Sequence, residues 1–149
     1  MNFALLQTLI NLEEKNLSKT KGMFISLALV VFIGVSDFLT GPELAFSIFY
    51  LLPITIATVV CGIRNGLVVS LISAITWLIA DVSSGHQYTH FLIPYWNSTV
   101  RLLYFCIHTV LLGNVIRFAM NMRDISWHDP MTGLVNWRYF REAVQRELA

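Results

Sequence analysis

The chain has 149 residues, of which 56% are apolar and 13% are charged, and its mean hydropathy is +0.64. Soluble domains average about 25% charged residues. The charged side chains of this chain are therefore too few to cover a water-exposed surface, and lipid must be part of its solvent. The formal net charge of +1 gives no reason to expect a nucleic-acid partner. Both cysteines lie in apolar runs, where neither a disulfide framework nor a zinc site is suggested.

We expect an all-α membrane fold, a bundle of four transmembrane helices. The apolar segments are Gly22 to Leu39, Leu44 to Ile63, Gly66 to Val82 and about Tyr95 to Ile116. Each approaches the roughly 20 residues that a helix needs to cross the hydrocarbon core. Before them, large apolar residues recur at helical spacing over residues 2–18, which predicts an interfacial helix on the cytoplasmic side. Pro53 removes a backbone donor and predicts a kink in the second span.

Lysine and arginine predict the orientation of the bundle, because cytoplasmic flanks of membrane helices are enriched in them. These residues precede the first span, separate the second from the third and follow the fourth: Lys15, Lys19, Lys21, Arg64, Arg117 and Arg123. The two opposite connections, Thr40 to Glu43 and Ser83 to Pro94, contain neither residue type. We therefore expect a multi-pass protein with both termini in the cytoplasm.

Three ionisable residues lie inside the spans at a similar depth. Asp37 is 16 residues from Lys21, Asp81 is 17 from Arg64, and Arg101 is 16 from Arg117. At about 1.5 Å per residue, all three lie about 24 to 26 Å from the inner boundary. An unpaired charge near lipid is costly, so one interpretation is a structural ion pair of Arg101 with Asp37 or Asp81.

A second interpretation, compatible with the first, is a site for a small molecule or ion that opens at the outer face. Aromatic and hydrogen-bonding residues gather around the charged layer, Tyr88 and Tyr95 among them, beyond the aromatic belt expected at any membrane interface. The candidate ligand-binding residues are Asp37, Glu43, Tyr50, Trp77, Asp81, His86, His90, Trp96, Asn97 and Arg101. The identity of the ligand is not predicted.

The histidines raise the question of metal or haem. His86 and His90 are four residues apart, which is a metal-ligand spacing on a helix, but a glycine and a proline nearby disfavour a helix, and we predict no metal site. His108 lies in mid-membrane at the depth of Thr55 and Ser73, and we expect a hydrogen bond to one of them. Haem is the alternative for His108, and its second histidine would have to come from a partner subunit.

After the fourth span, we expect the chain to continue as a helical stalk. Apolar residues there are spaced by 4, 3, 4 and 3 residues, which is the a/d pattern of a coiled coil. The predicted seam consists of His108, Leu111, Val115, Phe118, Met122 and Ile125, and Tyr104 extends it backwards. The stripe predicts a parallel homodimer, with packing against the bundle as the alternative.

The last residues, DPMTGLVNWRYFREAVQRELA, predict a helix break followed by a second amphipathic helix without a partner for its apolar face. They resemble the signature D-x-L-T-G-L-x-N-R-R-x-F that opens the GGDEF domain of diguanylate cyclases. The matching residues are Asp129, Thr132, Gly133, Leu134, Asn136, Arg138 and Phe140, whereas Met131 and Trp137 depart from the signature. The segment Ser36 to Ile54 also resembles membrane modules that precede such domains in bacteria.

The resemblance implies a sensory and anchoring module of the bacterial inner membrane. Its catalytic domain would join two GTP molecules into cyclic di-GMP with Mg²⁺, and the residues for that chemistry would lie beyond Ala149, so we expect no catalysis from this chain. The expected divisions are residues 1–21 (interfacial), 22–117 (transmembrane), 118–128 (stalk) and 129–149 (start of the GGDEF domain). The alternatives are a haem- or metal-binding membrane domain with a redox or transport role, and a passive membrane anchor.

Overall fold

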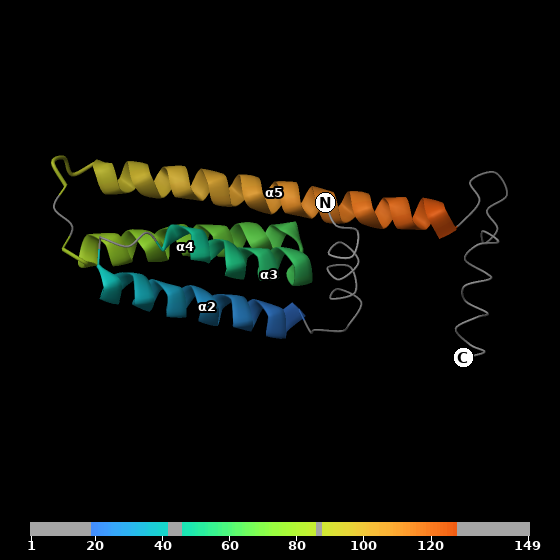
Figure 1. Cartoon of the computed structure of the whole chain (residues 1–149), viewed down its shortest axis with the longest axis horizontal. Helices are drawn as coiled ribbons and strands as arrows, with labels where there is room; N and C mark the ends of the chain where they lie inside the picture. Colours follow the sequence, from blue (N-terminus) through green and yellow to red (C-terminus); the bar gives the residue numbers. More distant parts are fainter. Residues whose placement is uncertain (1–18, 42–45, 86–87, 128–149) are drawn as a thin grey trace.

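The structure, a computed structural model, describes residues 19–41, 46–85 and 88–127, with side chains as far as residue 122. This part is helical and contains no strand; its elements are α2 (Lys19–Thr40), the 3-10 helix η1 (Ser47–Tyr50), α3 (Leu51–Cys61), α4 (Ile63–Ser83) and α5 (Ile93–Trp127). The four α-helices lie side by side along one direction (Figure 1), which confirms the expected all-α architecture. The predicted interfacial helix, Glu43, His86, the side chain of Ile125 and the signature at residues 129–149 lie outside the described residues.

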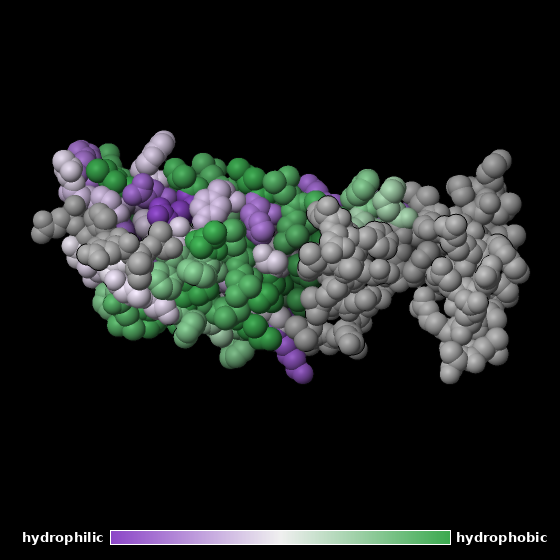
Figure 2. All heavy atoms as spheres, viewed as in Figure 1, coloured by the Kyte–Doolittle hydropathy of each residue, from purple (hydrophilic) through white to green (hydrophobic). Residues whose placement is uncertain are grey.

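Among the described residues, three helices are long and apolar enough to cross a membrane: Lys19–Thr40, Ile63–Ser83 and the part Ile93–Met122 of α5. Large apolar side chains cover their outer surfaces, and that of Phe24 is 75% exposed. On the face shown in Figure 2, apolar residues cover the middle of the bundle, and polar residues gather at the end where α5 begins. This distribution fits a protein whose surrounding solvent is lipid.

The second apolar segment forms a shorter helix than the span expected from Leu44 to Ile63. Together η1 and α3 form the apolar helical segment Ser47–Cys61, with a length of about 24 Å at the usual rise per residue. Pro53 lies in the first turn of α3 instead of at a mid-helix kink, a position that tolerates the missing N–H group. Gly62, at φ 89°, then allows α4 to begin after a one-residue break.

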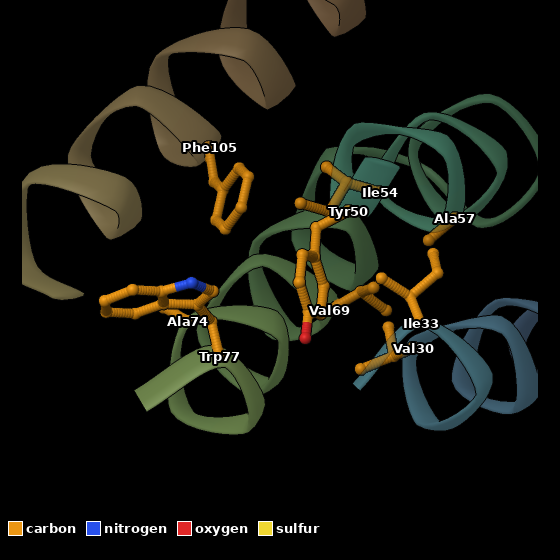
Figure 3. Close-up of a cluster of buried hydrophobic side chains, with 9 residues drawn as sticks. All are labelled: Val30, Ile33, Tyr50, Ile54, Ala57, Val69, Ala74, Trp77 and Phe105. Carbon is orange, nitrogen blue, oxygen red and sulfur yellow. The ribbon is translucent and has the colours of Figure 1, made fainter. Parts of the chain in front are cut away.

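The core lies where η1 and α3 meet the three long helices. Its buried residues are Val30, Ile33, Tyr50, Ile54, Ala57, Val69, Ala74, Trp77 and Phe105. Figure 3 shows the ring of Tyr50 at the centre, between Phe105 of α5 and Val30 of α2. The ring centroids of Tyr50 and Phe105 are 6.3 Å apart. One large aromatic side chain on the shortest helix therefore links α2 and α5.

Small residues bring the helices into close contact. A Cβ atom at Gly66 of α4 would meet Thr58 of α3 and Thr109 of α5, and one at Gly113 of α5 would meet Ile63 of α4. Such approaches are typical of membrane helices, which associate through close packing and interhelical hydrogen bonds. The α4 helix is thus packed against both neighbours with no room for a larger residue at these positions.

Two side-chain hydrogen bonds tie α5 to the other helices in mid-bundle. Ser70 Oγ of α4 lies 3.0 Å from Thr109 Oγ1, and Thr55 Oγ1 of α3 lies 3.0 Å from His108 Nε2. The second bond confirms the expectation that His108 pairs with a hydroxyl at its own depth. These bonds fix the position of α5 on the bundle near its middle.

The two ends of the bundle differ in charge. Lys19, Lys21, Arg64 and Arg117 mark one end, which we call the basic end, and the connection of residues 84–92 marks the other, the loop end. Figure 1 shows α5 continuing beyond the other helices past the basic end. Its 35 residues span about 52 Å, well beyond the roughly 30 Å of a hydrocarbon core.

Candidate functional site

A cluster of polar and aromatic side chains lies in the loop-end half of the bundle. We call it the polar cluster; its members come from α2, η1, α4, the connection and α5, and they are Asp37, Tyr50, Trp77, Asp81, Tyr88, Asn97 and Arg101. The structure brings the three charged members together, since both Asp81 and Asp37 act electrostatically on the guanidinium of Arg101. Counting residues from the basic flanks was therefore enough to place them in one layer.

Arg101 is held mainly by an aromatic ring. Its guanidinium carbon lies 3.5 Å from the centroid of the Trp77 ring, a cation–π contact that strengthens when it is removed from water. Its Nη1 donates a hydrogen bond of 3.2 Å to the carbonyl of Asn97, one turn earlier in α5. Its Nε is buried and has no hydrogen-bond partner. At least one N–H donor of the Arg101 guanidinium is thus without a hydrogen bond.

Asp37 and Tyr50 carry two further unpartnered atoms. The side chain of Asp37 is buried, with 8% of the residue exposed, and its Oδ2 makes no hydrogen bond. The hydroxyl of Tyr50 is also buried and makes no hydrogen bond within 3.5 Å; a Cβ on Gly34 of α2 would lie 3.5 Å from it. The hydroxyl faces the carboxylate of Asp37, so the two groups lie opposite each other as a donor and an acceptor. Such groups cost about 1–3 kcal/mol each and call for an explanation.

The sequence suggested an ion pair of Arg101 with Asp37 or Asp81, and the structure shows no hydrogen-bonded pair between Arg101 Nε and Asp37 Oδ2. Asp37 Oδ2 and Arg101 Nε are complementary, an acceptor and a donor, yet neither has a hydrogen-bond partner. The sequence could place the two residues at one depth, but it could not show that the indole of Trp77 takes the guanidinium instead. The rotation of each helix about its own axis decides which side chains pair.

Tyr88 connects the loop end to α4. Its hydroxyl donates a hydrogen bond of 2.6 Å to Asp81 Oδ2, the short distance typical of a hydroxyl bonded to a carboxylate. Burial raises the pKa of the Tyr88 phenol above its usual value, and the bond to Asp81 raises it further. The hydroxyl therefore remains a donor at neutral pH.

Tyr104 belongs to this region of the bundle and not to the α5 seam. Its hydroxyl donates a hydrogen bond of 3.0 Å to the carbonyl of Ser47 in η1, and its ring packs at 4.5 Å on that of Phe105. The heptad spacing predicted that Tyr104 extends the seam backwards. Spacing alone could not reveal that η1 lies opposite this turn of α5.

Other predicted site residues point elsewhere. Trp96 is 70% exposed on the outer surface, because it is rotated about 100° along α5 from Asn97; it fits the interfacial aromatic belt better than the polar cluster. His90 is also exposed, its Nδ1 accepts from the N–H of Leu92 at 3.3 Å, and its ring stacks on Phe91 at 4.9 Å.

Metal ligation finds no support in the part of the chain that the structure describes. No group of three or more histidine, cysteine, aspartate or glutamate side chains there could hold a metal ion. His108, the candidate haem ligand, has its Nε2 engaged by Thr55 within the bundle.

The α5 stripe divides into two parts. His108 packs inside the bundle, whereas Leu111, Val115, Phe118 and Met122 are exposed. Phe118 and Met122 follow Arg117 along the helix, and Phe118 is 65% exposed. An apolar surface is thus available on the half of α5 that extends past the basic end.

No family model, no curated protein and no solved structure matches this chain. Any functional assignment therefore depends on its own residues and their geometry.

Proposed function

We propose that this chain is a sensory and anchoring module of the bacterial inner membrane that regulates a diguanylate cyclase domain attached at its C-terminal end. The observation that carries the proposal is the continuity of α5, which begins at Ile93, passes the polar cluster and runs as one helix to Trp127. The residues that resemble the GGDEF signature start two positions later, at Asp129. A change of position at the polar cluster would reach them through a rigid element.

The proposed topology has four crossings, with both termini in the cytoplasm and the connection of residues 84–92 in the periplasm. Ser47–Cys61 is the short crossing. The asymmetry of lysine and arginine between the two ends supports this orientation. The polar cluster then lies in the outer half of the membrane, where a stimulus from outside the cell can reach it.

The proposed stimulus is a small molecule that binds at the polar cluster. Three buried polar atoms without partners, on Asp37, Tyr50 and Arg101, support a ligand at this place. A ligand that binds one arrangement of the bundle better than another shifts the population of the two arrangements, and α5 conveys the shift.

The proposed signalling unit is a parallel homodimer formed through the extended part of α5. Phe118 and Met122 are exposed beyond Arg117, where the helix would leave the membrane, and apolar side chains in water favour burial against a second copy. Single cysteines at these two positions should cross-link between subunits far better than a cysteine at Asn121. Equal cross-linking at all three positions would remove the argument for the seam.

The regulatory role is tested by joining residues 1–149 in frame to the remainder of a GGDEF domain and measuring cyclic di-GMP in cells. Two, four or seven alanines are inserted after Asn121. Seven residues complete about two helical turns and should preserve the wild-type level, whereas two residues rotate the output by about 200° and should change it at least several-fold. The four-residue insertion should fall between them.

A level of cyclic di-GMP that ignores the helical phase of the insertion would favour a passive anchor. The haem or metal alternative makes a different prediction, namely visible absorption and a stoichiometric metal content in the purified chain. Their appearance would replace the sensory proposal with a redox or transport function.

A further inference from the structure

We propose that Arg101 is the moving part of a two-state latch, which stacks on Trp77 in the arrangement described above and pairs with Asp37 in a second arrangement. The latch rests on the proposed sensory function and specifies how the polar cluster would be regulated. It provides the bistable element that a signalling bundle needs, because two alternative contacts compete for one side chain.

The first support is the complementarity of the unused groups. Arg101 Nε is a donor, Asp37 Oδ2 is an acceptor, and both are buried without a partner. The two residues already interact electrostatically. A second arrangement, in which the Arg101 side chain turns away from Trp77 and toward Asp37, would satisfy both atoms together and would give up the contact with Trp77.

The second support is that the guanidinium has favourable contacts in both arrangements. In the first, the guanidinium lies 3.5 Å from the Trp77 ring centroid and keeps its bond to the Asn97 carbonyl. In the second, the guanidinium would gain a charge-assisted hydrogen bond to a buried carboxylate, which is among the stronger contacts in proteins. The two contacts compete for the same guanidinium, and such competition is what a switch requires.

A third observation indicates how the loop end could bias the latch. Asp81 belongs to the same layer of charges as Arg101, and its carboxylate accepts a hydrogen bond from the hydroxyl of Tyr88. A ligand that moves Tyr88 would reposition Asp81 and would change the relative attraction of the two states for Arg101. Two other ionisable groups face Asp37, namely the carboxylate of Asp81 and the hydroxyl of Tyr50.

The geometry of α5 converts this side-chain movement into a movement of the output end. Thr109 and His108 tie α5 to α4 and α3 in mid-bundle, and they can serve as a pivot. Arg101 lies about 12 Å on one side of this pivot, and Trp127 lies about 27 Å on the other. A displacement at the latch would be roughly doubled at the end of α5, in the opposite direction.

The latch is tested with the full 149-residue chain in lipid nanodiscs, with ¹⁵N-labelled arginine. The Nε–Hε signal of Arg101 is assigned by its loss in Arg101→Lys, and the ring current of Trp77 should shift it upfield in the wild type. Trp77→Leu should move it downfield to the range of a carboxylate-bound guanidinium, and adding Asp37→Asn should reverse that downfield move. Asp37→Asn alone should leave the upfield signal in place.

Trp96→Leu is the matched control, because Trp96 lies on the outer surface of α5, five residues before Arg101. It should leave the Arg101 signal unchanged. If Trp77→Leu does not fold, Trp77→Phe allows the same comparison with a smaller shift. An identical Arg101 signal in the Trp77 variant with and without Asp37→Asn would overturn the latch, because Asp37 would then not be the second partner.

The cyclase fusion separates failure of the latch from failure of the sensory proposal. Trp77→Phe and Asp37→Asn favour opposite states and should change cyclic di-GMP in opposite directions, each by at least two-fold. The expected arginine shifts without any effect on the fusion would support the latch and contradict the sensory function. A fusion that follows the phase of the alanine insertions but lacks the arginine shifts would contradict the latch alone.

Discussion

Gly66→Ala should destabilise the bundle by pushing α4 away from two neighbours at once. The new methyl group would collide with Thr58 Oγ1 of α3 and would lie 2.8 Å from Thr109 Cγ2 of α5. The nearest atoms belong to threonine side chains of two packed helices, so relief requires a threonine to leave its rotamer or a helix to shift. The hydrogen bond between Ser70 and Thr109, at 3.0 Å, would be stretched by that shift.

The expected size follows from three opposing terms. Overpacking a well-filled site costs about 1–3 kcal/mol, and losing an interhelical hydrogen bond in a membrane protein costs about 0.6 kcal/mol on average. Alanine is favoured over glycine in a helix by about 1 kcal/mol. The net loss in the free energy of unfolding is therefore about 0.6–2.6 kcal/mol.

The assay is reversible unfolding of the purified chain in mixed micelles, titrated with a denaturing detergent and monitored by circular dichroism. Thr58→Ala and Thr109→Ser remove the two atoms that the methyl group meets, and the serine keeps the hydroxyl that pairs with Ser70. Adding both to Gly66→Ala should restore at least half of the lost stability. The packing argument would be refuted by an unchanged Gly66→Ala midpoint, or by a triple variant no more stable than Gly66→Ala.

Three further predictions concern single groups. Tyr88→Phe should lower the stability of the bundle near neutral pH. Because the pKa of Tyr88 is raised in the folded state, the stabilising contribution of its hydroxyl is complete below about pH 10 and is lost as the pH rises further. A stability difference between variant and wild type that grew above that pH would contradict this pH dependence. Thr55→Val should cost about 0.6–1.7 kcal/mol by removing the partner of His108, as measured by the same unfolding titration. A cysteine at Ser84 should react with an impermeant thiol reagent added to intact spheroplasts, and a cysteine at Asn65 should not; the reverse labelling would invert the proposed topology.

The long helices could be located from the sequence because crossing a membrane depends on the sum of apolarity over about 20 residues. The predicted spans Gly22 to Leu39 and Gly66 to Val82 lie inside α2 and α4, each within three residues of the observed ends. The depth of the polar layer was equally accessible, because a helix advances by a constant rise and the basic residues mark its origin. The same count placed His108 at the depth of Thr55 and Ser73, and the structure shows that Thr55 is the partner.

The tertiary structure alone decided which groups at one depth meet. Arg101 lies on Trp77 and not on Asp37, and Tyr104 faces Ser47 instead of extending the seam. These outcomes depend on the rotation and tilt of each helix, which are set by close packing at residues such as Gly66. The shortness of the second helix could not be predicted from the sequence either, because apolarity does not show at which residue of an apolar segment the helix begins. Depth follows from a sum along one helix, but a contact requires the orientations of two helices, and these are determined only when the whole bundle packs.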